Sequence, residues 1–126
     1  MNCVVCKEPM VTYELQKVEI DHCLNCDGIW LDAGELEILL EEADEVQAFL
    51  AQFRDASAEK SSRKCPICLK KMEQVALGSG KKVQIDRCRN HHGIWFDRGE
   101  LREVIEIFDA NQNNKVLELL RGVFNK

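Results

Sequence analysis

The feature that most constrains this chain is a pattern of paired cysteines that occurs twice. The first copy holds two Cys-x-x-Cys pairs separated by sixteen residues, a separation typical of structural zinc sites. The second copy repeats the plan, with His in place of the last Cys. The predicted ligands are Cys3, Cys6, Cys23 and Cys26 in site 1, and Cys65, Cys68, Cys88 and His91 in site 2.

The last ligand of site 2 has two neighbouring candidates. His91 aligns with Cys26 when the copies are superposed, whereas His92 aligns with Asp27. Ligand spacing favours His91, and His92 is the alternative. His22 adjoins a complete set of four cysteines, so we expect it on the surface or behind a ligand.

Each copy continues into the same short elbow, Gly-Ile-Trp, one apolar residue, Asp, one variable residue and Gly-Glu-Leu. The Asp and Glu of each elbow have the spacing of a capping box at a helix start. That position explains the four carboxylates without a catalytic role. Because apolar neighbours flank both Trp residues, we expect them as buried wedges between ribbon and helix. The elbow residues in question are Asp32, Glu35, Asp97, Glu100, Trp30 and Trp95.

Hydrophobic periodicity predicts the remaining elements. Alternating residues between the ligand pairs predict a short antiparallel hairpin in each copy. Apolar stripes predict amphipathic helices over 36–53 and 101–124, the second interrupted at 111–114. These stripes are expected to pack together or to mediate a homodimer.

The predicted fold is therefore a small, metal-stabilised α+β protein of two tandem zinc ribbons. Each ribbon is a short antiparallel hairpin with two metal knuckles, followed by an amphipathic helix. The predicted domains are 1–53 for the first ribbon and helix, 54–64 for a linker without large apolar residues, and 65–126 for the second ribbon with a helix or broken helix.

Composition narrows the class of protein. No apolar run is long enough to span a membrane, and Cys3 leaves no room for a signal peptide, so we expect a soluble cytoplasmic protein without a membrane partner. In that compartment cysteine pairs favour metal over the alternative of disulfides. Four protein ligands per site leave no open coordination position, which predicts two structural zinc ions and no enzyme activity. Iron in the all-cysteine site is an alternative.

Charge points to possible partners. The net charge is −5, yet residues 65–99 carry seven basic and three acidic side chains. This basic region is the candidate contact for an anionic partner. The expected partner is either a protein or a nucleic acid, and the composition does not decide between them. The candidate anion-binding residues are Lys70, Lys71, Lys81, Lys82, Arg87 and Arg89.

The two ligand pairs, the hairpin and the Gly-Ile-Trp, Asp, Gly-Glu-Leu elbow resemble the transcription factor IIB-type zinc-finger family, small ribbons of mostly prokaryotic proteins. The resemblance covers residues 3–36 and 65–101. It implies a zinc ribbon with the seven cysteines as ligands, and His91 departs from the usual fourth Cys. It also implies a transcription-associated binding module that contacts nucleic acid or the transcription machinery. The alternative is a protein–protein adaptor with purely structural zinc and no nucleic-acid contact.

Overall fold

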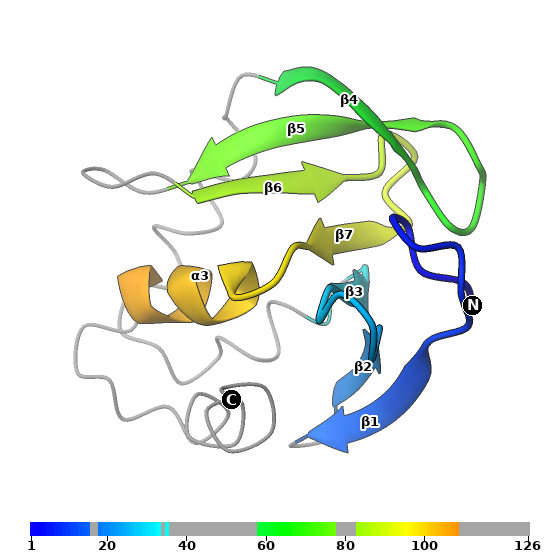
Figure 1. Ribbon diagram of the computed structural model, residues 1–126. Helices are drawn as coiled ribbons and strands as arrows, with labels where there is room; N and C mark the ends of the chain where they lie inside the picture. The colour runs from blue at the N-terminus through cyan, green and yellow to red at the C-terminus, as the bar shows by residue number, and fades with distance from the viewer. Residues whose placement is uncertain (16–17, 34, 36–57, 78–82, 109–126) are drawn as a thin grey trace.

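The computed structural model describes residues 1–15, 18–33, 35, 58–77 and 83–108. These residues form one antiparallel sheet of seven strands, together with one helix (Figure 1). The elements are β1 (Val11–Leu15), β2 (Val18–His22), β3 (Ile29–Asp32), β4 (Ala58–Lys64), β5 (Lys71–Leu77), β6 (Val83–Arg87), β7 (Gly93–Phe96) and α3 (Glu100–Phe108).

Each copy contributes a hairpin and one following strand. In the first copy β1 pairs with β2, and β2 pairs with β3. The second copy repeats this with β5, β6 and β7. Alternation explains the inner strands, since Val18 and Ile20 of β2 are buried while Glu19 between them is exposed. The predicted hairpin in each copy is confirmed.

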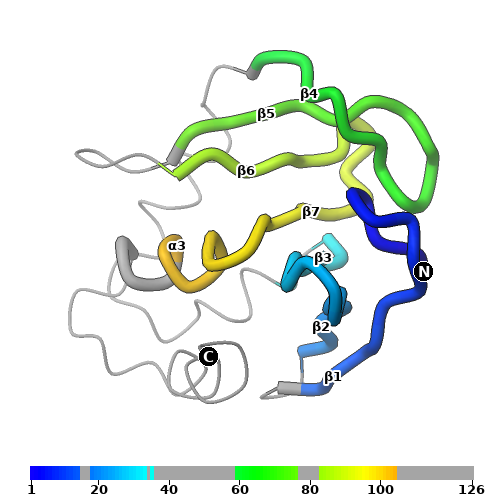
Figure 2. The backbone as a smooth tube through the Cα atoms, in the orientation of Figure 1, coloured from blue at the N-terminus to red at the C-terminus, as the bar shows by residue number. Residues whose placement is uncertain are grey.

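The two copies join through their last strands into a single sheet. β3 pairs antiparallel with β7, and Trp30 lies directly opposite Trp95. On either side, Ile29 pairs with Phe96 and Leu31 with Ile94. Since equivalent residues exchange places across the pair, the joint has an approximate two-fold axis at the two tryptophans. Figure 2 shows the two halves of the sheet meeting where β3 and β7 lie side by side.

Two glycines make this joint possible. A Cβ atom on Gly28 would lie 2.2 Å from the Trp95 ring, and one on Gly93 would lie 2.5 Å from the Trp30 ring. Each tryptophan therefore packs over the glycine that begins the elbow of the other copy. Both indoles are fully buried, as expected. They lie between the copies and pack with the metal-ligand cysteines. Their role as wedges against the helices stays a prediction.

The elbow hydrogen bonds hold the strand ends. The backbone N–H of Asp97 donates to Glu100 Oε1 at 2.7 Å, and that of Asp32 donates to Glu35 Oε1 at 3.1 Å. These bonds confirm the capping-box prediction for the Glu side chains. Each Asp carboxylate also accepts the indole N–H of the Trp two residues earlier, at 3.0 and 3.1 Å. The elbow thus couples a buried indole to the turn that follows it.

The helices are described only in part. The described part of the chain contains the single helix α3, whose Leu101 and Val104 are buried and which contacts β6. The predicted stripe over 36–53 lies outside the described residues, as does 109–126. An amphipathic helix in both copies is therefore not supported. Within the described residues no helix is long and apolar enough to cross a membrane.

The predicted linker over 54–64 is wrong for its second part, because Ala58–Lys64 forms β4 at the edge of the sheet beside β5. Its side chains are polar, so they carry no hydrophobic signal. Polar contacts hold it instead, since Arg63 donates to both Asp86 and Asp97. Burial raises the pKa of Asp86, and the Ser61 hydroxyl and Arg63 oppose that shift. The domain limits 1–53 and 65–126 stay predictions.

We expect Gly93→Ala to lower the free energy of unfolding of the zinc-loaded protein by about 2–3 kcal/mol, because the added methyl overpacks a closed joint. Gly99→Ala is the control. It has φ +81° and no atom within 4 Å of the added Cβ, so only backbone strain of about 1 kcal/mol is expected. Denaturant unfolding followed by the fluorescence of the two buried tryptophans measures both. Equal losses in the two variants would contradict the close packing at Gly93.

A second expectation concerns pH. Burial, with Asp97 and Asp86 nearby, raises the pKa of Glu100 from 4.5 to about 7. The folded state therefore binds the Glu100 proton more tightly than the unfolded state does. The stability that this proton contributes is lost as pH rises from about 4.5 to 7. Glu100→Gln keeps an acceptor for the Asp97 N–H and removes the charge. We expect this variant to be more stable than the wild type at pH 8, by about 1 kcal/mol after allowing for solvent screening.

The advantage of Glu100→Gln should shrink towards pH 5. Thermal unfolding across this range, with zinc content checked at each pH, measures the difference. A stability difference that does not change with pH would contradict the raised pKa of Glu100.

Candidate metal centres

Each ligand pair lies in a tight turn of the same length. In all four turns the backbone N–H of the first ligand donates to the carbonyl oxygen five residues later. We call residues 3–8, 23–28, 65–70 and 88–93 ligand turns 1 to 4. These bonds measure 2.7 Å (Cys3 to Glu8), 3.0 Å (Cys23 to Gly28), 2.9 Å (Cys65 to Lys70) and 3.0 Å (Cys88 to Gly93).

Ligand turns 1 and 2 bring four thiols together. The Sγ atoms of Cys3, Cys6, Cys23 and Cys26 all lie within 4.8 Å of one another, and Cys3 and Cys26 are 3.6 Å apart. Zinc–sulfur bonds of about 2.3 Å in a tetrahedron place sulfur atoms about 3.8 Å apart. The group therefore has the spacing of a zinc site, and all four residues are those that the sequence predicts.

Ligand turns 3 and 4 form the second group, with one correction. His92, not His91, joins Cys65, Cys68 and Cys88 within 4.8 Å. Its Nδ1 atom is 3.5 Å from Cys88 Sγ and 3.8 Å from Cys65 Sγ. The imidazole of His91 is exposed. The two groups fit two zinc ions, as predicted.

The backbone explains why His92 replaces the predicted His91. In the other three turns the first ligand's carbonyl oxygen accepts a hydrogen bond from the backbone N–H of the fourth residue after it. That fourth residue has a positive φ of 61° to 64°. In ligand turn 4 the donor is the third residue instead, because the His91 N–H donates to the Cys88 carbonyl oxygen at 3.1 Å. His91 itself has φ 62°. The chain therefore reverses one residue sooner, which directs the next side chain to the thiols. The only signal in the sequence was the adjacent pair of histidines.

Hydrogen bonds support the sulfur atoms. Backbone N–H groups of Val5 and Cys6 donate to Cys3 Sγ at 3.3 and 3.2 Å, and Asn90 N–H donates to Cys88 Sγ at 3.3 Å. The Asn25 amide also reaches Cys6 Sγ at 3.2 Å, across from one ligand turn to the other. Such donors orient ligands and disperse thiolate charge. Asn25 was missed in the sequence, although Asn stands at the equivalent position 90 in the second copy.

The thiols differ in how readily they ionise. The backbone N–H of Lys70 is the main cause that lowers the pKa of Cys68 to about 6, while burial raises the pKa of Cys65 to about 11. Zinc binds thiolates, so loading site 2 must displace at least the Cys65 proton at neutral pH. Metal affinity should therefore fall as the pH is lowered.

His22 is not a surface residue. It is buried, and its Nε2 lies 3.0 Å from a carboxylate oxygen of Asp27. Asp27 is the residue that aligns with His92, so the same position serves a polar contact in one copy and a ligand in the other.

The predicted basic region is only partly available to a partner. Arg87 and Arg89 each contact Glu73, at 3.2 and 3.5 Å. Lys70 and Lys71 are exposed. Lys81 and Lys82 lie outside the described residues. Anion binding by this set therefore stays a prediction.

The ligand turns, the elbow and their repetition agree with a comparison against protein families. A family model described as "Transcription factor zinc-finger" matches residues 2–42 and again 64–107, which together exceed half of the chain. The chain belongs to the transcription factor zinc-finger family. Comparison with curated proteins finds no match.

Membership in the transcription factor zinc-finger family confirms two tandem copies of one zinc-ribbon unit. The two matched segments each contain one complete ligand group and the elbow that follows it. The described structure is thus a small, metal-stabilised antiparallel sheet with two zinc-ribbon sites.

We expect His92→Ala to lower bound zinc from two ions per chain to one, because it removes a donor from site 2. His91→Ala is the matched control and should keep both ions. Metal content after exhaustive dialysis at pH 7.5 measures this by mass spectrometry. Loss of an ion from the His91 variant, with none lost from the His92 variant, would restore the ligand assignment that spacing favours.

Proposed function

We propose that this protein is a non-enzymatic, transcription-associated zinc module that binds a protein of the transcription machinery through its ligand turns. One observation carries this proposal. The exposed large apolar side chains of the described residues all lie in the ligand turns or next to them, and Leu24 and Leu69 are 65% and 69% exposed. Two of these side chains, Met1 and Leu69, line one hollow, and exposed apolar side chains that meet in this way are typical of a protein-binding surface. The complete set is Met1, Val5, Leu24, Ile67 and Leu69.

The metal sites favour binding over catalysis. Each group supplies four protein donors, which fill the tetrahedral shell of zinc and leave no position for substrate. The elbow carboxylates Glu35 and Glu100 accept backbone N–H groups and so already have a structural role. Zinc then serves to hold the ligand turns, and with them the exposed leucines, in fixed positions.

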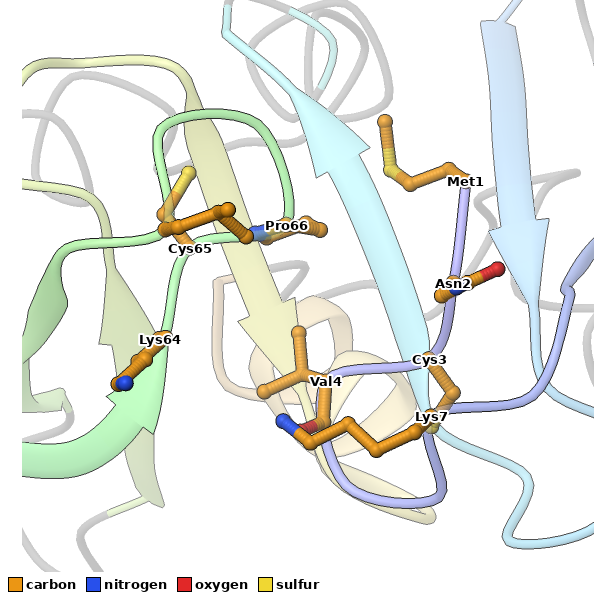
Figure 3. A pocket seen from close by; sticks show the side chains of 9 residues that line it. Met1, Asn2, Cys3, Val4, Lys7, Lys64, Cys65 and Pro66 are labelled. Atoms are coloured by element: carbon orange, nitrogen blue, oxygen red, sulfur yellow. The ribbon is translucent and has the colours of Figure 1, made fainter.

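A hollow between the two metal sites adds to this surface. It has a volume of about 370 Å³ and lies between ligand turns 1 and 3. Figure 3 shows Val4 and Lys7 on one side, Lys64 and Pro66 on the other, and Met1 at the rim. An apolar side chain from a partner could enter between these turns, with the lysine ammonium groups at its edge.

Nucleic acid is the second candidate partner. Lys70 and Lys71 are exposed, and so are Lys7 and Lys64 next to the hollow. None of the four forms an ion pair with another described side chain. The Lys7 ammonium donates to the Val4 carbonyl oxygen at 3.0 Å. Exposed lysines can neutralise phosphates. The pairing of Arg87 and Arg89 with Glu73 makes this candidate weaker. A homodimer through the predicted helices stays a prediction, because the first of them lies outside the described residues.

The test compares both partners directly. The zinc-loaded protein is immobilised and exposed to purified RNA polymerase from the same organism. Leu24→Ser and Leu69→Ser together should weaken binding at least tenfold, since they remove the most exposed apolar contacts. Gln84→Ala, an exposed position on β6, is the control and should leave binding unchanged.

Fluorescence anisotropy with labelled single- and double-stranded DNA and RNA, at low and at physiological salt, tests the second candidate. Salt-sensitive binding that is lost in Lys70→Glu/Lys71→Glu and unaffected by the leucine changes would favour nucleic acid. Absence of binding in both experiments would refute both candidates.

A further inference from the structure

The two copies differ at one edge of the sheet. In the second copy β5 is covered on its outer side by β4. In the first copy the equivalent strand is β1, and it is the last described strand of the sheet. Aligned by their ligand turns, Val11 corresponds to Glu73 and Tyr13 to Val75. The pairing of β4 with β5 is therefore a template for a strand that pairs with β1.

The first copy begins the same path. Asn2 pairs with Pro9 in an isolated bridge, and the equivalent pair in the second copy is Lys64 with Lys71. There the pairing resumes after an irregularity, with Lys60 opposite Glu73 and Ala58 opposite Val75. Beside β1, no described residue continues the ladder in this way.

Side-chain burial records the difference. Met72 and Val75 of the second copy are fully buried, whereas their equivalents Met10 and Tyr13 are only partly buried. Gln74 is partly buried, while its equivalent Thr12 is exposed. At these three positions the first copy is less covered, which is the effect expected where an edge strand has no neighbour among the described residues.

The charge beside this edge is negative. Glu14 of β1 and Glu19 of β2 are exposed and lie directly opposite each other. Asp21 accepts a hydrogen bond from Thr12 at 2.7 Å but has no cationic partner among the described residues. Its equivalent Asp86 is buried beneath Arg63. No described cation forms an ion pair with Glu14, Glu19 or Asp21.

We propose that β1 binds an extended, basic peptide segment of a partner protein, which adds as a strand beside Val11–Leu15 as β4 does beside β5. The backbone groups of β1 supply the ladder, as in other strand-addition complexes. A lysine or arginine opposite Glu14 forms a cross-strand pair of opposite charge. This surface differs from the ligand turns, so the inference goes beyond the proposed function.

Charge decides against a second copy of the chain as the occupant. A second β1 would bring another Glu14 to an edge that already carries Glu14 and Glu19, so it would add negative charge there, and like charges across a strand pair are unfavourable. The chemistry of the edge therefore selects a basic partner.

The experiment titrates a synthetic peptide with the sequence of residues 58–64 preceded by one added lysine, Lys-Ala-Glu-Lys-Ser-Ser-Arg-Lys, into the zinc-loaded, ¹⁵N-labelled protein. In the register of β4 the added lysine lies opposite Glu14. We expect amide shifts along Val11–Leu15, and amide exchange at least fivefold slower at saturation at every second residue of β1, whose N–H points away from β2. A peptide with proline in place of Ala58 and Glu59, which are paired residues of the ladder in β4, keeps the basic side chains but cannot form the ladder, and it should not protect β1.

Matched charge reversals locate the site. Glu14→Lys should weaken peptide binding at least tenfold, whereas Glu59→Lys, an exposed change of equal charge on β4 at the other edge, should leave it unchanged. Shifts confined to β4 or to the ligand turns would overturn the proposal. So would equal binding of the proline peptide, protection of β1 that depends on protein concentration alone, or no response at millimolar peptide.

Discussion

The packing of Trp30 over Gly93 and of Trp95 over Gly28 is the contact on which the rest of the structure depends. It closes β3 against β7 and turns two small units into one sheet. Around the two buried indoles lie the cysteines of both ligand groups, so the metal sites and the joint share one core. A unit of this size has too little apolar surface for a stable core of its own. The duplication supplies a second unit, and the zinc ligands fix the turns at its border.

The duplicated unit has diverged where each copy meets its surroundings. At equivalent positions the first copy uses Asp27 to contact His22, while the second uses His92 as a metal ligand. Both fit because a turn closed one residue earlier redirects the side chain without changing the turn's length. At the sheet edges the divergence is larger, since β5 has β4 beside it and β1 has no described neighbour. The two copies are therefore equivalent where β3 meets β7 but different at the outer strands β1 and β5. The same repeated unit thus has a different surface in each copy.

These surfaces support the binding function proposed above. Closed ligand shells, carboxylates engaged with backbone N–H groups and exposed leucines on the ligand turns all favour recognition. Rigid turns with apolar tips lose little conformational freedom on binding, because the metal restrains them beforehand. The negative edge at β1 and the exposed lysines near the hollow lie on different elements, so partners of opposite charge can be kept apart.

The sequence alone determined the duplication, the seven cysteine ligands, the hairpins and the Glu side chains at the elbows, because these depend on local spacing and alternation. It favoured His91 as the last ligand where the structure has His92, since the direction of that side chain depends on where the turn reverses. It also missed β4, whose polar side chains are held by distant partners such as Asp86 rather than by an apolar pattern. Only the tertiary structure showed that the tryptophans pack between the copies. The reason is that β3 and β7, which pair with each other, are more than sixty residues apart in the sequence. Local chemistry therefore fixed the metal sites, and long-range pairing decided how the two copies form one protein.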